Sequence, residues 1–183
     1  MIKGKPLIQH VIEQVTKSKR VTEIIVATSS KKSDDKLISF LEKIKVKYFR
    51  GSLNNVASRF LKIAKNKNKK FFIRISGDSP LISPKIINRA IVLYKKNPKY
   101  DLITNIFPRT FPQGQSVEII KLSVLEKNIS NMNENDLEHV TKFFYRNNHN
   151  FLIKNFVFTG KNLLIKMAVD TKKDLKNILK IIK

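Results

Sequence analysis

The clearest chemical signal in this sequence is a carboxylate that follows an apolar segment and a glycine. Residues 71–75 read Phe-Phe-Ile-Arg-Ile, and residues 76–80 read Ser-Gly-Asp-Ser-Pro. Because Gly77 allows a tight turn and Pro80 resists further strand pairing, the pattern predicts Asp78 at the carboxyl end of a strand. A carboxylate in that place suits Mg²⁺, which is held by one or two protein carboxylates together with phosphate oxygens.

Two features bear on whether Asp78 has a chemical role. Gly, Asp, Ser and Pro are the usual turn-forming residues, so a purely structural turn is the alternative interpretation. Arg74 favours a functional site, because a charge within a predicted buried strand requires a partner or a ligand.

A second carboxylate, Asp170, follows the apolar residues 163–169, which are predicted to form another strand. On its own, Asp170 is also typical of a residue that caps the helix predicted from Thr171 onward. Residues 171–174, Thr-Lys-Lys-Asp, resemble a capping box at the start of that helix, with Asp in place of Glu. Two carboxylates at the same edge of a sheet would be able to share a metal ion and a triphosphate.

Further polar segments stand where predicted elements begin or end. Small and hydroxyl residues in them permit the close approach of a base or ribose, and Arg50 suits a phosphate or a carboxylate. Each segment is also compatible with an ordinary loop, and His139 with a structural hydrogen bond. These segments are Thr28-Ser29-Ser30, Arg50-Gly51-Ser52, Gln113-Gly114-Gln115 and Glu138-His139-Val140-Thr141.

The elements that position these residues follow from the spacing of apolar side chains. Apolar stripes at helical spacing predict helices over residues 5–19, 37–44, 56–64, 86–94, 135–146 and 171–183. Short β-branched and aromatic runs predict strands over residues 22–28, 46–49, 71–75, 100–104, 116–120, 151–158 and 163–169. The alternation predicts an α/β fold with a mostly parallel sheet and helices on both of its faces. In such sheets, ligands bind beyond the carboxyl ends of the strands.

Length and composition limit the class of protein. A chain of 183 residues fits a single domain over residues 1–183, and 42% hydrophobic with 28% charged residues is an ordinary globular composition. The absence of cysteine excludes disulfides, thiolate metal sites and a cysteine nucleophile, and three histidines argue against a multi-histidine zinc site. No apolar run approaches the length of a membrane span, and the first residues do not read as a secretory signal, so a cytoplasmic location is expected.

The net charge is unusual, because 37 basic residues stand against 14 acidic ones and give +23. Such a charge attracts polyanions, including nucleic acid, anionic membranes and phosphorylated small molecules. The alternative interpretation is a composition that is rich in lysine, isoleucine and asparagine throughout, with no selected basic face.

Taken in order, several segments resemble the cytidylyltransferases that activate acidic sugars. The segments are Gly4-Lys5-Pro6-Leu7, Ile25-Val26-Ala27-Thr28, Phe49-Arg50-Gly51-Ser52, Arg74-Ile75-Ser76-Gly77-Asp78-Ser79-Pro80-Leu81, Glu138-His139-Val140-Thr141 and Val169-Asp170-Thr171. The likeness is greatest to the spore-coat polysaccharide biosynthesis protein F type, a branch related to the acylneuraminate and 3-deoxy-manno-octulosonate cytidylyltransferases. It implies a three-layer αβα, Rossmann-like nucleotidyltransferase fold.

The resemblance also implies an activity and the residues that perform it. CMP would pass from CTP to an acidic sugar of cell-surface polysaccharide synthesis, with Mg²⁺ and release of pyrophosphate. Asp78 and Asp170 would hold the metal, and Arg74 would support catalysis. The nucleotide would lie near Thr28, Arg50, Gly51, Ser52 and Gly77, and the sugar near Gln113, Gly114, Glu138 and His139. CTP and an acidic sugar are the expected partners, nucleic acid and membrane insertion are not expected, and a homodimer is left open.

The sequence departs from the family pattern in two places. Ser116 stands where the family usually has Asp, two residues after Gly114. The family also begins with a strand and a loop of the type Ala-Arg-x-Gly-Ser-x-Arg, and the given sequence starts after them. From this we expect a sheet without its first strand and weak activity for the chain as given.

Two functions of other classes are kept as alternatives. One is a basic protein that binds nucleic acid or an anionic surface with the same fold, although the sequence shows no recognised nucleic-acid motif with aromatic platforms. The other is a catalytically inactive partner subunit.

Overall fold

The computed structural model describes residues 1–160 and 165–182, which form two compact units. Unit 1 comprises residues 1–22 and 73–119 together with the described part of 153–183, and unit 2 comprises residues 23–72 and 120–152. The expected single domain over residues 1–183 stays a prediction.

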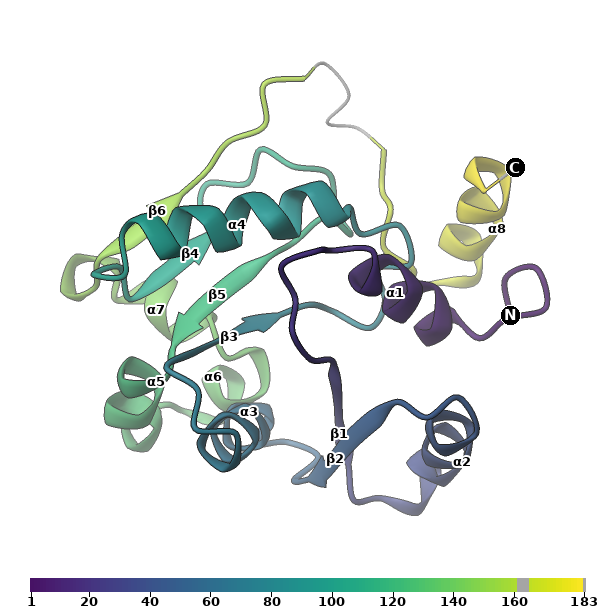
Figure 1. The fold of residues 1–183 in the computed structure, drawn as a ribbon, viewed down its shortest axis with the longest axis horizontal. Coiled ribbons are helices and arrows are strands. Elements are labelled where there is room, and N and C mark those ends of the chain that lie inside the picture. Colours follow the sequence, from purple (N-terminus) through teal and green to yellow (C-terminus); the bar gives the residue numbers. More distant parts are fainter. Residues whose placement is uncertain (161–164, 183) are drawn as a thin grey trace. The chain divides into compact units, whose positions relative to one another are not determined.

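Unit 2 is built on a parallel pair of strands with a helix on either side (Figure 1). Its elements are β1 (Ile25–Ser29), α2 (Asp35–Lys43), β2 (Lys47–Gly51), α3 (Val56–Asn66), α5 (Leu122–Asn128), α6 (Glu134–His139) and α7 (Lys142–Arg146). The parallel register pairs Thr28 with Arg50 and Ser29 with Gly51. The two segments, both predicted to lie near a nucleotide, are therefore adjacent at the ends of their strands.

Local chemistry explains how α3 forms and packs within unit 2. Its N-cap is Asn55, whose side chain accepts a hydrogen bond from the Ser58 backbone N–H and satisfies one of the free amides of the first turn. One face of the helix stacks Phe60 on Phe72, with ring centroids 5.3 Å apart. This packing fixes α3 against the start of β3 (Phe71–Arg74) and sets the position of its first turn beside the ends of β1 and β2.

A four-stranded sheet follows the order β3-β5-β4-β6. Unit 1 contains β4, β6, the second half of β3 and the first half of β5. The further elements are α1 (Leu7–Thr16), α4 (Pro84–Lys96), β4 (Leu102–Thr104), β5 (Glu118–Lys121), β6 (Ile153–Asn155) and α8 (Lys172–Ile181). Strands β4 and β6 are parallel, whereas the arrow of β5 points opposite to that of β4 (Figure 1). Ile103 and Ile119 are fully buried, which explains why the apolar runs in these strands do not alternate with polar residues.

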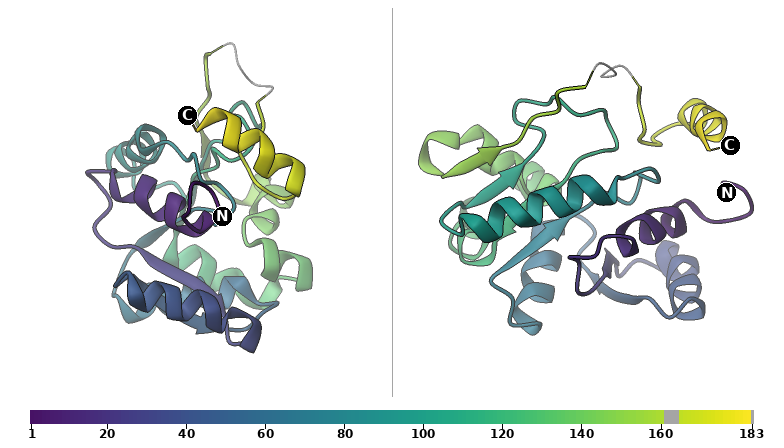
Figure 2. Two further views of the ribbon diagram at one scale, coloured as in Figure 1. Left: turned by 90° about the vertical axis from the view of Figure 1, so that its right-hand side faces the viewer. Right: turned by 45° about the horizontal axis from the view of Figure 1, so that its top comes forward.

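Helix α4 lies along this sheet beside β4, as both Figure 1 and Figure 2 show, and it also contacts α1. Together with the parallel strands and flanking helices of unit 2, this arrangement confirms the predicted α/β class with a mostly parallel sheet. The predicted cap of the last helix is also confirmed, because Thr171 and Asp174 form a reciprocal capping box at the start of α8.

The helix predicted over residues 135–146 is confirmed in part, because the chain is helical over residues 134–139 and 142–146 but is divided into α6 and α7. The break falls at Val140, which has a φ of 54° and is completely buried. A positive φ is costly for a β-branched residue, so tertiary packing must outweigh the cost. The turn buries Val140 and also directs Phe143 and Phe144 into the interior of unit 2, where the latter packs on Phe151.

The predicted strand over residues 163–169 is also wrong for its described part, residues 165–169, while residues 161–164 lie outside the described part of the chain. Two hydrogen bonds explain the difference. The Met167 N–H donates to the Gln113 carbonyl at 2.7 Å, and the Val169 N–H donates to the Asp78 carbonyl at 2.9 Å. Because the two acceptors belong to different loops, no ladder with one neighbouring strand forms.

Two differences at the level of single elements remain. The strand predicted over residues 151–158 is confined to residues 153–155, and α5 was not predicted. Helix α5 has only seven residues, which is too short for a repeating apolar stripe to be recognised in the sequence.

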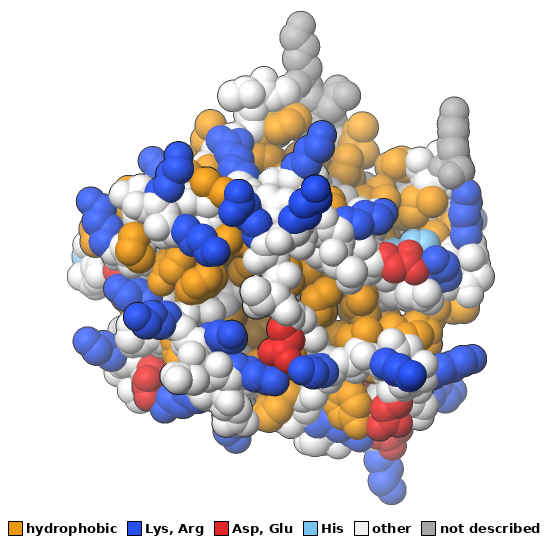
Figure 3. Space-filling view, viewed as in Figure 1, with side chains coloured by type: hydrophobic (Ala, Val, Ile, Leu, Met, Phe, Trp, Pro, Cys, Tyr) orange, Lys and Arg blue, Asp and Glu red, His pale blue; other side chains and the backbone are white. Residues whose placement is uncertain are grey.

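The hydropathy of the helices and the charge on one face of the molecule bear on the expectations from composition. Within the described residues, no helix is both long and apolar enough to cross a membrane. On the face shown in Figure 3, lysine and arginine side chains are scattered over the view without forming one continuous patch. This scatter favours the interpretation of the +23 charge as a property of the whole composition.

Candidate active site

Three segments of unit 1 meet around the two predicted metal carboxylates. They are residues 76–83 after β3, residues 113–115 before β5, and residues 165–170 before α8. Val169, which directly precedes Asp170, donates its backbone N–H to the Asp78 carbonyl at 2.9 Å. The structure therefore brings the backbones of Asp78 and Asp170 together, although neither lies in a strand.

Gln115 fastens these three segments to one another. Its Oε1 accepts a hydrogen bond from the Ser83 N–H at 2.9 Å, and its Nε2 donates to the Leu81 carbonyl at 2.6 Å and approaches Met167 Sδ at 3.2 Å. The residue is buried, so its amide is a fixed structural link. The sequence analysis included Gln115 in a polar loop segment but did not predict this structural role, since a glutamine in a predicted loop carries no signal of burial.

Gly114 has a structural role that its predicted position near the sugar did not reveal. Its φ is +90°, and a Cβ placed on it would lie 2.4 Å from Met167 C and 2.5 Å from Ala168 N. Only glycine lets the two backbones approach so closely. Gly114 thereby holds the segment that carries Asp170, while the neighbouring Gln113 is exposed.

The two carboxylates differ in their surroundings. Asp78 is partly buried, and its Oδ1 accepts a hydrogen bond from Ser79 Oγ at 2.7 Å. Asp170 is exposed, and its Oδ2 pairs with Lys166 Nζ at 2.6 Å. Among the contacts of the described residues, Asp78 Oδ2 and Asp170 Oδ1 accept no hydrogen bond, so each carboxylate keeps one oxygen for a ligand.

Lys166 joins Asp170 to the start of α8. Its ammonium also pairs with Asp174 Oδ2 at 2.7 Å, and the hydrogen bonds to Asp170 and Asp174 raise the pKa of Lys166. The same contact, with help from Thr171 and backbone N–H groups, lowers the pKa of Asp174 from 3.8 to about 2. Asp170 is therefore held from two sides, by its backbone and by Lys166.

Arg74 has a protein partner that the sequence analysis did not name. Its Nη1 donates to Glu118 Oε2 at 2.6 Å, across the neighbouring strands β3 and β5, and the Glu118 side chain is completely buried. The positive charge of Arg74, which was expected to need a partner or a ligand, is thus compensated by Glu118 within the sheet. A glutamate between Val117 and Ile119 in an apolar run was the sequence signal for this pair.

In unit 2, the predicted nucleotide residues gather at the carboxyl ends of β1 and β2. Asp34 Oδ2 accepts hydrogen bonds from Thr28 Oγ1 at 2.6 Å and Ser29 Oγ at 2.7 Å. The Ser29 and Thr28 hydroxyls lower the pKa of Asp34. Arg50 donates to the Ser29 and Lys31 carbonyls and pairs with Asp35 at 2.7 Å. Thr28 and Arg50 are thus engaged within the loops that follow the two strands, while Ser52 is exposed.

Arg59, on α3, is a polar residue of this region that sequence reasoning missed. It is 9% exposed, its Nη1 donates to the Ala27 carbonyl at 3.3 Å, and its Nε has no hydrogen-bond partner among the described residues. Burial lowers the pKa of Arg59. Its Cγ lies 2.8 Å from the place that a Cβ on Gly51 would occupy, so Gly51 makes room for this side chain.

Comparison with known proteins decides the family. The family described as cytidylyltransferase matches residues 1–183. The chain belongs to the cytidylyltransferase family. The resemblance inferred from the ordered motifs is therefore confirmed.

Relatives of known sequence show how far the match extends. The chain is 33% identical to the uncharacterized protein MJ1063 of Methanocaldococcus jannaschii, over 96% of this chain and 72% of that protein. It is 27% identical to the spore coat polysaccharide biosynthesis protein SpsF of Bacillus subtilis, over 94% of this chain and 72% of SpsF. It is 30% identical to the 3-deoxy-manno-octulosonate cytidylyltransferase of Bdellovibrio bacteriovorus, over 67% of this chain and 49% of that enzyme.

A solved structure supports the fold. A cytidylyltransferase from Leptospira borgpetersenii matches with a TM-score of 0.90 and 29% identity, over 96% of this chain and 74% of that one. The nucleotidyltransferase type of the α/β fold is thereby confirmed, as is membership in a family of sugar nucleotide activation.

Within this family fold, the donor set of the site fits one kind of metal ion. Two carboxylates offer hard oxygen ligands, which Mg²⁺ prefers. In the described part of the chain, no three or more His, Cys, Asp or Glu residues lie close enough together to hold a metal ion. A cation at Asp78 and Asp170 would therefore take its remaining ligands from water and a bound phosphate group, as Mg²⁺ commonly does.

The remaining predicted sugar residues lie in unit 2. Glu138 and His139 are exposed on α6 in unit 2, whereas Gln113 and Gly114 belong to unit 1. Their role at a sugar site stays a prediction.

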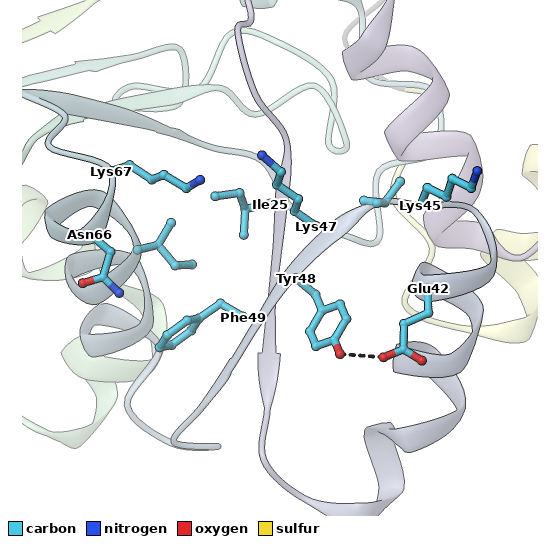
Figure 4. Close-up of a pocket in the computed structure, with 10 residues that line it drawn as sticks. Ile25, Glu42, Lys45, Lys47, Tyr48, Phe49, Asn66 and Lys67 are labelled. Atoms are coloured by element: carbon cyan, nitrogen blue, oxygen red, sulfur yellow. Dashed lines mark hydrogen bonds between the residues drawn. The ribbon is translucent and has the colours of Figure 1, made fainter.

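A hollow of about 370 Å³ lies elsewhere, at the amino ends of β1 and β2 in unit 2 (Figure 4). Tyr48 points toward α2 and donates to Glu42, whereas Phe49 points toward α3. Ligands of parallel sheets bind at the opposite, carboxyl ends, and none of the predicted site residues lines this hollow. Its lining residues are Ile25, Glu42, Lys45, Val46, Lys47, Tyr48, Phe49, Ile63, Asn66 and Lys67.

Proposed function

We propose that this protein transfers CMP from CTP to an acidic sugar for cell-surface polysaccharide synthesis, and that Asp78 and Asp170 hold a Mg²⁺ ion at the reacting phosphates. The observation that carries the proposal is the hydrogen bond from the Val169 N–H to the Asp78 carbonyl, which joins the two backbone segments that carry these carboxylates. The names of SpsF and of the 3-deoxy-manno-octulosonate cytidylyltransferase support the substrate class.

The reaction is a displacement at phosphorus. A sugar hydroxyl oxygen attacks the α-phosphorus of CTP, the bond from that phosphorus to the bridging oxygen breaks, and pyrophosphate leaves with the bonding electrons. The hydroxyl proton passes to solvent. A bound Mg²⁺ would neutralise charge that develops on the phosphate oxygens.

The chain's own residues contribute position and charge. Gln115 and Gly114 hold the segments that carry Asp78 and Asp170, which supports a site whose backbone is fixed before a ligand arrives. Lys166 keeps Asp170 oriented at the start of α8. Because CTP is an intracellular nucleotide, the proposal places the reaction in the cytoplasm.

The decisive experiment measures pyrophosphate release from CTP with 3-deoxy-manno-octulosonate or N-acetylneuraminate as acceptor, while Mg²⁺ is varied. Asp78→Asn removes charge but little volume, so turnover should fall by orders of magnitude while the melting temperature stays the same. Glu126→Gln is the control, because this carboxylate is exposed and pairs only with Lys65 at the surface. Wild-type rates in Asp78→Asn, or turnover without a divalent cation, would overturn the proposal.

A further inference from the structure

Arg109 presents a guanidinium whose charge is not matched by an acidic side chain. Its Nη1 and Nη2 both donate to Ser116 Oγ, each at 3.2 Å, and a hydroxyl carries no charge. Within the described residues, no carboxylate lies at ion-pair distance from Arg109. Three other arginines of the chain each pair with a carboxylate, namely Arg50 with Asp35, Arg74 with Glu118 and Arg146 with Asp136.

The turn that carries Arg109 is held firmly within unit 1. Asn155 Nδ2 donates to the Pro108 carbonyl at 3.0 Å, and the Phe158 N–H donates to Thr110 Oγ1 at 2.9 Å. The buried Phe111 ring then packs on Phe156 and Phe158, with centroids 5.6 Å and 5.3 Å away. An exposed arginine on such a fixed turn loses little freedom when it binds a ligand.

Ser116 connects this turn to the candidate active site. It directly follows Gln115, whose side chain reaches the loop after Asp78 and the segment before Asp170. Residues 113–115, which precede Ser116, also accept the Met167 N–H through the Gln113 carbonyl at 2.7 Å. Through Ser116, Arg109 is therefore anchored to the loop that joins the segments carrying Asp78 and Asp170.

We propose that Arg109 binds the carboxylate of the acceptor and thereby selects an acidic sugar. This inference rests on the proposed function. Ser116 takes one N–H group from Nη1 and one from Nη2 and orients the guanidinium without neutralising it. The N–H groups on the remaining edges of the planar guanidinium can still match the two oxygens of a carboxylate. An aspartate in place of Ser116 would pair with the guanidinium and neutralise it.

The test compares binding of two acids with binding of their C1 methyl esters, which lack the charge. The probes are 3-deoxy-manno-octulosonate and N-acetylneuraminate, and the measurement is calorimetry on the full chain. Wild type should bind at least one acid about 10- to 100-fold more tightly than its ester, the range of a hydrogen-bonded charge pair. Arg109→Gln should abolish the preference, Arg109→Lys should restore part of it, and Ser116→Asp should reduce it. Arg20→Gln, an exposed arginine of the same unit, should leave it unchanged.

CTP binding, measured beside the sugars, separates this inference from the proposed function. Loss of CTP binding and turnover in wild type would overturn the proposed function. Suppose that CTP binds but that wild type binds the acid and its ester with equal affinity, or binds neither. Arg109 then does not select the acid. The same conclusion holds if Arg109→Gln keeps the preference for the acid. Weakened CTP binding in Arg109→Gln with the acid preference intact would assign the residue to the phosphates and likewise overturn the inference.

Discussion

Gly114 shows how a single residue without a side chain controls the position of the segment that carries Asp170, a proposed metal ligand. Its α-hydrogen faces the backbone of Met167 and Ala168, and the segment that carries Asp170 is seated against it. The predicted contact with a sugar and the observed packing are compatible, because the same glycine can adjoin a ligand. The packing against Met167 and Ala168 is by itself enough to require glycine at position 114.

The first prediction concerns Gly114→Ala. The new methyl group would overlap Met167 at 2.4 Å in a backbone conformation with φ +90°, so the segment must move. We expect a loss of about 2 kcal/mol or more in unfolding free energy, which is typical of backbone strain and overpacking, together with a fall in pyrophosphate release. Gly77→Ala is the folding control, because its methyl would meet only Ile8 at 3.5 Å. Equal stability of the two variants would contradict the packing argument.

The second prediction concerns pH and Asp174. The pKa of this carboxyl is about 2 in the folded protein and ordinarily 3.8, because Lys166, Thr171 and backbone N–H groups stabilise the charged form. A lowered pKa means that the stabilisation is complete above about pH 4 and is lost as the pH falls toward 2. The difference in urea midpoint between wild type and Asp174→Asn should therefore shrink over that interval. Midpoint curves that run parallel from pH 6 to pH 2 would show that Asp174 contributes no such stabilisation.

At the scale of the elements, the pairing of β3 with β5 includes a buried ion pair where a ligand contact was predicted. Strand β3 leads to the Asp78 turn, and Arg74 is its last residue. Since Glu118 is fully buried and Arg74 is 24% exposed, the pair fixes the register of two strands next to the site. Arg74 thus acts on the site at least through the position of β3.

The third prediction uses this pair. Glu118→Gln leaves the Arg74 charge without its partner and should cost about 3 kcal/mol, the lower end of the range for breaking a buried pair, because water reaches Arg74. Arg74→Met combined with Glu118→Leu should recover most of that loss in urea unfolding. If the double variant is stable yet releases no pyrophosphate, Arg74 acts in catalysis as well. A double variant no more stable than Glu118→Gln would show that the ion pair is not the cause of the loss.

At the scale of the whole molecule, the dominant property is a net charge of +23. Basic side chains spread over the surface raise the local concentration of any anion and do not specify one ligand. In the proposed function, the choice of ligand therefore depends on the carboxylates in unit 1 and on the hydroxyl and arginine groups in unit 2. The net charge affects the association rate and the affinity of anions in general.

The fourth prediction follows from the screening of this charge. At 0.1 M ionic strength the screening length is about 10 Å, and it shortens as salt is added. CTP affinity measured by calorimetry should therefore weaken steadily between low and high salt. A short DNA duplex should bind weakly at physiological salt. Binding of the duplex that is tighter than binding of CTP would favour the nucleic-acid alternative, and CTP affinity independent of salt would contradict the electrostatic argument.

The sequence alone determined the features that depend on neighbours along the chain. Strand runs such as residues 71–75, the turn at Gly77 and Asp78, and the cap at Thr171 arise from side-chain periodicity and turn chemistry within a few residues, and all three were predicted. The family also followed from the sequence, since ordered motifs need no coordinates to be recognised.

Only the tertiary structure decided the contacts between distant segments. The partner of Arg74 is 44 residues away in Glu118, Gly114 packs on Met167, and Val140 adopts a costly φ in order to become buried. The same holds for residues 165–169, whose hydrogen bonds go to two separate loops and form no strand. No local pattern encodes these features, because the free energy that stabilises them comes from burial and hydrogen bonds formed only when the chain has folded.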